Sequence, residues 1–161
     1  MSVPFRVGHG YDVHRLCEGR LLVLGGVTVP YEKGLLGHSD ADVLTHALMD
    51  AMLGAAGLGD IGKHFPDTSA EFEGISSLVL LGRVASALKQ SGYSLTNADI
   101  TVVAQRPKLA PFLSEMRGNL ARVLGLEESC LNIKATTEEK LGFTGSGEGI
   151  AAHAVCLIER A

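Results

Sequence analysis

The chain has 161 residues, of which 46% are hydrophobic and 20% are charged, and its formal net charge is −4 at pH 7. This length predicts a single domain, residues 1–161, with room for a real core. The negative net charge argues against general nucleic-acid binding, which needs a basic surface. An anionic substrate would therefore have to be held by a metal ion, by backbone N–H groups or by a few local cations.

The cysteines and the N-terminal residues indicate a cytoplasmic protein. Cys17, Cys130 and Cys156 are odd in number and widely spaced, so we expect free, buried thiols and a reducing compartment. The first residues show no charged segment followed by an apolar run, so no signal or transit peptide is expected. No apolar stretch is long enough to span a bilayer.

The first elements along the chain are a strand, a hairpin and a helix. A strand is predicted over residues 5–13, and the apolar runs 21–24 and 27–30 flank two glycines, which is typical of a hairpin. Ser39 or Asp40 is expected to cap a helix that runs to about residue 56 and ends at Gly57. Three acidic or imidazole side chains lie four residues apart on this helix and form one polar stripe: Asp42, His46 and Asp50.

The rest of the chain alternates helices and strands. A polar, glycine-rich loop is expected over residues 59–68, and the elements that follow are helices 75–90 and 107–124 and strands 95–104, 132–136 and 149–159. This order predicts an α/β (α+β) sandwich, a mixed sheet with amphipathic helices on one face. The last strand is apolar on both sides for much of its length, so we expect other subunits to bury the second face of the sheet.

Asp12 and His14 stand two residues apart in the predicted first strand. Period-2 geometry points both side chains to the same face. A carboxylate and an imidazole supply two of the three protein ligands of an open zinc site, and His46 could be the third. The alternative is three unrelated residues, but Gly8 and Gly10 favour a site because they would let a substrate approach.

Three further segments are candidates for binding phosphate. His38 and Ser39 precede the first predicted helix, where the N–H groups and the dipole favour an anion, although Ser39 could be a plain cap. Residues 134–140 carry hydroxyls and acidic groups that suit a nucleotide phosphate with a divalent ion; a capped strand exit is the alternative. The loop 142–149 matches neither the P-loop nor the dinucleotide pattern, and is either a phosphate cradle or a flexible hairpin.

Together these segments resemble the 2-C-methyl-D-erythritol 2,4-cyclodiphosphate synthase family of the non-mevalonate isoprenoid pathway. The resemblance covers nearly the whole chain, through ordered motifs at residues 8–14, 25–27, 30–35, 38–40, 59–68, 134–145 and 147–151. It implies that 4-diphosphocytidyl-2-C-methyl-D-erythritol 2-phosphate is converted to the 2,4-cyclodiphosphate with release of CMP. The substrate's own 2-phosphate would attack its β-phosphate.

The resemblance also implies a homotrimer, with the sheets packed around a threefold axis and the active sites between subunits. One zinc ion per subunit would be held by Asp12, His14 and His46, and Mg²⁺ or Mn²⁺ would bind Glu139. His38 and Thr137 would act on the transition state. The residues implied to bind substrate are Asp12, His14, His38, Ser39, Asp60, Ile61, Gly62, Phe65, Pro66, Asp67, Thr68, Ser69, Ala104, Pro107, Lys108, Leu109, Ala135, Thr136, Thr137, Glu139 and Phe143.

One residue departs from the family pattern, and two other functions stay open. Position 146 is Ser where an arginine is expected beside an anion in the threefold cavity, so that secondary site is in doubt. A zinc-dependent phosphohydrolase would share the zinc ligands and would need a base such as Asp50 or Asp67. A non-catalytic module that binds isoprenoid diphosphates would leave the zinc ligands idle.

Overall fold

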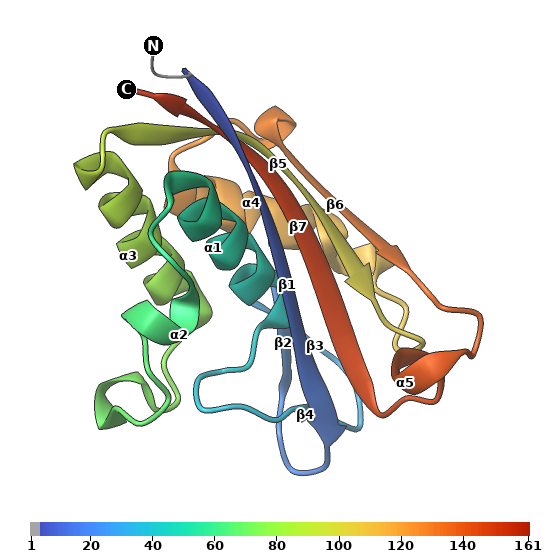
Figure 1. Ribbon diagram of the computed structural model, residues 1–161. Helices are drawn as coiled ribbons and strands as arrows, with labels where there is room; N and C mark the ends of the chain where they lie inside the picture. Colours follow the sequence, from blue (N-terminus) through green and yellow to red (C-terminus); the bar gives the residue numbers. More distant parts are fainter. Residues whose placement is uncertain (1–3) are drawn as a thin grey trace.

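The protein is described by a computed structural model that covers residues 4–161, built around a five-stranded sheet (Figure 1). The strands follow the order β4-β1-β7-β5-β6. Their bounds are β1 Phe5–Cys17, β4 Gly34–Leu35, β5 Tyr93–Val103, β6 Leu131–Thr136 and β7 Gly149–Arg160. Because β5 and β6 are parallel and the other neighbours are antiparallel, the sheet is mixed, as predicted. A separate hairpin pairs β2 (Leu22–Leu24) with β3 (Val27–Val29).

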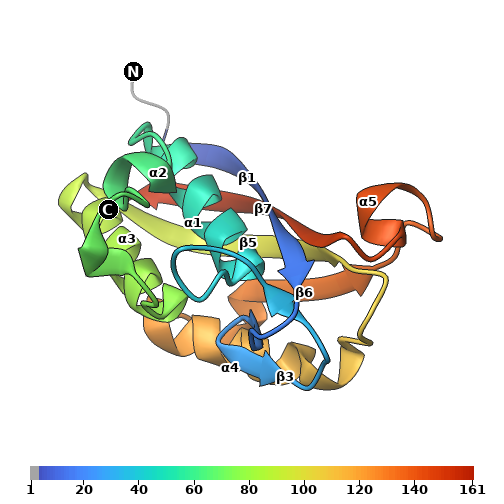
Figure 2. The same ribbon diagram turned by 90° about the horizontal axis from the view of Figure 1, so that it is seen from below.

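Three long helices pack against one side of this sheet: α1 Val43–Ala56, α3 Ser77–Gln90 and α4 Leu113–Leu124. Figures 1 and 2 show α3 and α4 on the same side of the strands. The two loops expected to be irregular each contain one short helix, α2 (Ile61–His64) and α5 (Gly142–Gly145). Single 3₁₀ turns complete the chain at Ala70–Phe72, Ala110–Phe112 and Glu128–Cys130.

The central helix α1 lies unusually close to β1, and two glycines permit this approach. A Cβ atom on Gly8 would lie 1.9 Å from the carbonyl oxygen of Ala51, and one on Gly10 would lie 1.9 Å from that of Ala47. Both glycines therefore face the backbone of α1. The interpretation that they open a path for substrate was wrong, since the helix occupies that space.

The N-terminus of α1 is capped by Asp42, not by Ser39 or Asp40. The Asp42 carboxylate accepts hydrogen bonds from the backbone N–H and the hydroxyl of Thr45, and it also accepts from the N–H groups of Gly25 and Gly26. It thus ties the β2–β3 hairpin to the helix. Its side chain is fully buried, and His46 is nearly so, so the expected polar stripe does not face solvent.

The other face of the sheet is left open by the described residues 4–161. On β1 and β7 most side chains that point away from the helices are exposed, among them Val7, Tyr11, Val13 and Val155. The expectation that β7 is apolar on both sides for much of its length is confirmed, with the exposed His153 as a polar residue on the open face. Cys17, Cys130 and Cys156 are free thiols, as expected, but only Cys156 is buried, and the other two are half-buried. Among the described residues, no helix has the length and apolar character needed to cross a membrane.

Candidate active site

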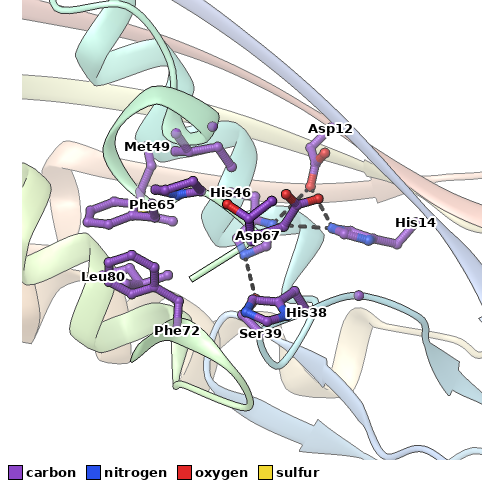
Figure 3. Close-up of a pocket in the computed structure, with 15 residues that line it drawn as sticks. Asp12, His14, His38, Ser39, His46, Met49, Phe65, Asp67, Phe72 and Leu80 are labelled. Carbon is purple, nitrogen blue, oxygen red and sulfur yellow. Dashed lines mark hydrogen bonds and ion pairs between the residues drawn. The ribbon is translucent and has the colours of Figure 1, made fainter. Parts of the chain in front are cut away.

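Three side chains converge where β1 passes the first turn of α1 (Figure 3). Asp12 and His14 point to the helix side of β1, as the period-2 pattern predicts, and His46 reaches them from α1. The Oδ2 atom of Asp12 lies 3.0 Å from Nε2 of His14 and 3.1 Å from Nδ1 of His46, and these two nitrogens are 3.2 Å apart. Each residue directs one ligand atom to a common point.

A backbone carbonyl fixes the ring of His14. Its Nδ1 lies 2.8 Å from the carbonyl oxygen of Leu36, and a carbonyl only accepts, so Nδ1 carries a proton and donates. In the neutral ring, Nε2 therefore presents its lone pair toward Asp12 and His46. A histidine oriented through its far nitrogen is typical of metal sites in proteins.

A relay of hydrogen bonds fixes the ring of His46 in the same way. Its Nε2 lies 2.8 Å from the hydroxyl of Ser77, which donates to the carboxylate of Asp40 in a short hydrogen bond. Because the Ser77 proton points to Asp40, the hydroxyl oxygen accepts from Nε2 of His46. In the neutral ring, Nδ1 is then unprotonated and faces Asp12. The Ser39 hydroxyl lies farther from the same Nε2, at 3.3 Å.

The charges of the cluster suit a cation. Burial alone would raise the pKa of Asp12, but its hydrogen bonds with His14 and His46 outweigh burial and hold this pKa at about 2. Burial lowers the pKa of His14, yet the neighbouring Asp12 carboxylate raises it overall. Asp12 is therefore ionised at neutral pH and attracts positive charge. A bound divalent ion would take the place of a proton between the His14 ring and the carboxylate.

The donor set fits zinc. Ligands at about 2.0–2.1 Å in a tetrahedron stand about 3.3–3.4 Å apart, and the three ligand atoms here are separated by 3.0–3.2 Å. Two imidazoles and one carboxylate on the wall of an open pocket match a catalytic zinc site with its fourth position free. Asp12, His14 and His46 can therefore hold the ion without rearrangement of the backbone.

A pocket of about 470 Å³ opens beside these ligands (Figure 3). It brings together many of the residues that the sequence assigned to substrate: Asp12, His14, His38, Ser39, Ile61, Gly62, Phe65, Pro66, Asp67 and Thr68. Two others act at its edge, since Asp60 caps α2 and the carbonyl of Ser69 accepts from Nε2 of His38 at 2.8 Å.

Sequence reasoning missed the apolar floor of this pocket. Met49, Phe72 and Leu80 line it, and Phe65 packs edge-on against Phe72 with ring centroids 5.4 Å apart. Met49 and Leu80 have the spacing of ordinary core residues, so the sequence carries no signal that separates them from the core. Asp50, considered as a catalytic base, accepts from the N–H of Ile61 at 2.8 Å and positions the pocket loop.

A second cavity, of about 460 Å³, lies where β5 and β6 end. It is lined by Ala104, Gln105, Pro107, Lys108, Leu109, Ala110, Ala135, Thr136, Thr137 and Glu139, which include all of the residues expected around cytidine. The Thr137 hydroxyl lies 3.2 Å from Oε1 of Glu139, and Glu139 has a left-handed backbone with φ of 52°. A non-glycine residue held in this region is often found at functional sites. Phe143 lines neither cavity.

The two cavities share no residue and lie on different sides of the chain. β7 and β5 separate β1 from β6 in the sheet, so the ligand-bearing strand and the strand of the second cavity are roughly 14 Å apart. Figures 1 and 2 both place α2, beside the first cavity, and α5, close to the second, at opposite sides of the strands. Within one chain, Thr137 and Glu139 therefore do not meet the zinc ligands.

Comparison with known proteins settles the family. Residues 5–159 match the YgbB family. The 2-C-methyl-D-erythritol 2,4-cyclodiphosphate synthase of Geobacter metallireducens is 66% identical over 96% of this chain and 99% of the relative, and the same enzyme of Geobacillus kaustophilus is 62% identical over 97% and 99%. This chain belongs to the YgbB family.

The fold agrees with solved structures of such synthases. The CDP complex of IspF from Plasmodium falciparum is 33% identical, superposes with a TM-score of 0.86, and covers 99% of both chains. The mixed sheet with helices is thus the fold of the YgbB family. The resemblance inferred from the motifs is confirmed.

Proposed function

We propose that this chain converts 4-diphosphocytidyl-2-C-methyl-D-erythritol 2-phosphate to 2-C-methyl-D-erythritol 2,4-cyclodiphosphate and CMP. The observation that carries the proposal is the convergence of Asp12, His14 and His46 on the wall of a pocket that combines polar and apolar residues. The close relatives bear the name of this synthase over almost their whole length. A structural neighbour in complex with CDP supports a cytidine diphosphate substrate.

The substrate supplies its own nucleophile in this reaction. An oxygen of the 2-phosphate bonds to the β-phosphorus, the bond from that phosphorus to the bridging oxygen breaks, and CMP leaves with that oxygen. The protein therefore needs to position the two phosphates and neutralise charge, with no nucleophile of its own. Zinc held by Asp12, His14 and His46 would supply Lewis acidity at a phosphate oxygen.

His38 is placed to act on the phosphates from the zinc side. Its ring lines the first pocket, and the hydrogen bond from Nε2 to the carbonyl of Ser69 fixes its orientation. Nδ1 is then the ring atom available to substrate. The imidazolium form of the ring, in which both nitrogens donate, would offer a phosphate oxygen a hydrogen bond from Nδ1. Through this hydrogen bond, His38 would stabilise the charge that develops in the transition state.

Thr137 and Glu139 would act from the second cavity. The Glu139 carboxylate is an oxygen ligand of the kind that Mg²⁺ or Mn²⁺ prefers, and such an ion would arrive with the diphosphate. Ala104, Pro107, Lys108 and Leu109 surround the place proposed for cytidine. The hydroxyl of Thr137 donates to the Glu139 carboxylate and accepts from the N–H of Glu139. It would turn its proton to a phosphate oxygen once the carboxylate binds the ion.

A complete site then needs two copies of the chain. The zinc ligands and the 60–69 segment would come from one subunit, and the cytidine cavity with Thr137 and Glu139 from its neighbour. A homotrimer with the open sheet faces toward its axis meets this requirement. It would also cover exposed apolar side chains such as Val7, Tyr11 and Val155, which no element within residues 4–161 covers.

The deciding experiment measures CMP release and identifies the second product. A cyclic diphosphate confirms the proposal, whereas linear products indicate the zinc-dependent phosphohydrolase, and no turnover indicates a binding module.

The shared site is tested by mixing two inactive variants, Asp12→Ala and Glu139→Ala. After subunit exchange, hybrid trimers contain some sites with neither change, so activity should return. If mass spectrometry verifies exchange and no activity returns, the shared-site arrangement is wrong.

A further inference from the structure

Two histidines stand together on the open face of the sheet, on the side opposite the zinc ligands. His9 lies on β1 and His153 on β7, and both side chains are exposed. Nε2 of His9 is 3.3 Å from Nδ1 of His153. Neither ring takes part in the active site described above.

The positions of both rings are set by the sheet. Tyr11 is paired with His153 across the two antiparallel strands, so His9 is the diagonal neighbour of His153 on the same face. The ring of Tyr11 packs against that of His153 with centroids 4.8 Å apart. The backbone of two long central strands and one aromatic contact therefore hold the imidazoles near one another before any ligand arrives.

The separation of the two nitrogens fits a metal ion better than a direct hydrogen bond. Hydrogen bonds donated by N–H groups are commonly about 2.9–3.0 Å long. Two nitrogens that bind one tetrahedral zinc ion at about 2.0–2.1 Å lie about 3.3–3.4 Å apart. The 3.3 Å separation of the two nitrogens matches this edge of the tetrahedron.

We propose that His9 and His153 chelate a second divalent transition-metal ion, of the zinc class, on the open face of the sheet. Imidazole nitrogen is a preferred ligand of such ions, and bidentate binding requires no movement of the backbone. Water completes the coordination in a single chain. The ion binds more weakly than the one at Asp12, His14 and His46, because it has only two protein ligands and no carboxylate among them.

The trimer adds a consequence that rests on the proposed function. With the open faces toward a threefold axis, three copies of the pair face one another across it. Imidazoles from neighbouring copies then replace water as ligands. The ion would join the subunits at their centre, away from the reacting phosphates.

The test is zinc binding to the purified full-length protein at increasing free zinc, followed by equilibrium dialysis and metal analysis. The wild type should bind in two steps, a tight one and a weaker one. His9→Ala and His153→Ala should each lose the weaker step and keep the tight one, and His14→Ala should do the reverse. His64→Ala is the matched control and should keep both steps, because its ring donates to the carbonyl of Leu58 elsewhere on the surface.

The outcomes separate the proposal from the proposed function. A single step in the wild type, or a weaker step that survives in both His9→Ala and His153→Ala, overturns the second site. Circular dichroism and native mass establish that the variants fold and assemble, and His153→Gln repeats the test with a polar side chain of similar size. His153→Ala should retain CMP release at saturating zinc. Loss of the weaker step with unchanged turnover supports this site whether or not the cyclase assignment holds.

Discussion

Removal of one buried hydroxyl, in Ser77→Ala, should weaken zinc binding although Ser77 touches no ligand atom of the metal. The Ser77 hydroxyl accepts a hydrogen bond from Nε2 of His46 at 2.8 Å and donates one to the carboxylate of Asp40. Without it, His46 loses the partner that keeps Nδ1 unprotonated and aimed at Asp12. The substitution leaves the backbone N–H of Ser77 bonded to Asp40 at 2.9 Å, so the start of α3 stays in place.

The expected loss of zinc affinity follows from the role of the Ser77 hydroxyl, which is the hydrogen-bond partner of the metal ligand His46. Loss of such a group commonly lowers metal affinity 10–100-fold, which corresponds to about 1.4–2.7 kcal/mol. The Ser39 hydroxyl, 3.3 Å from the same Nε2, can take over in part. We therefore expect Ser77→Ala to lie near the lower end of this range and Ser39→Ala/Ser77→Ala near the upper end.

The assay is competition for zinc against a chromophoric chelator, with CMP release measured at limiting and at saturating zinc. Because Ser77 positions a ligand and does not touch substrate, excess zinc should restore most of the turnover. Ser86→Ala is the matched control, since its hydroxyl bonds only to the carbonyl of Gly82 on the exposed side of the same helix. An unchanged zinc affinity in folded Ser77→Ala protein would refute the relay.

Three further variants test the packing around the site. Asp42→Ala should lower the free energy of unfolding by about 2–4 kcal/mol in urea titrations, because a helix cap is lost and the N–H groups of Gly25 and Gly26 lose their acceptor. Gly10→Ala should destabilise by about 3 kcal/mol or more, whereas Gly54→Ala, on an unobstructed part of α1, should stabilise by about 1 kcal/mol. Burial raises the pKa of Cys156 to about 11, so iodoacetamide at pH 8 should label Cys17 and Cys130 before it; equal rates would contradict this.

The candidate metal ligands could be predicted from the sequence because their geometry is local or periodic. Asp12 and His14 share a face through the period-2 pattern of one strand, and that face is the one that packs on α1. The relay behind His46 could not be predicted. Asp40 and Ser77 stand 37 residues apart and meet only through tertiary packing. Asp40 has an ordinary local role as a turn residue, and Ser77 is the first residue of α3, which Ser76 caps.

The N-cap of α1 could not be predicted from local sequence preferences alone. Ser39, Asp40 and Asp42 are all good N-cap residues within one turn of the helix start. The structure selects Asp42 because its carboxylate can also reach the N–H groups of the β2–β3 hairpin, and it leaves Asp40 for Ser77 and Ser39 for the pocket. Tertiary contacts thus decided between residues with equal local propensity.

The glycines of β1 had two explanations that a sequence cannot separate. A glycine beside a ligand either opens space for substrate or lets another backbone approach, and both uses need the absence of Cβ. The coordinates decide for the second, since the missing Cβ positions coincide with carbonyl oxygens of α1. This close approach has a functional consequence, because it brings His46 on α1 within 3.1 Å of Asp12 on β1. A larger residue at Gly10 would separate the helix from the strand and so pull the third zinc ligand from the other two. Helix packing and metal binding therefore depend on the same two glycines, and loss of stability and loss of zinc should appear together in Gly10→Ala.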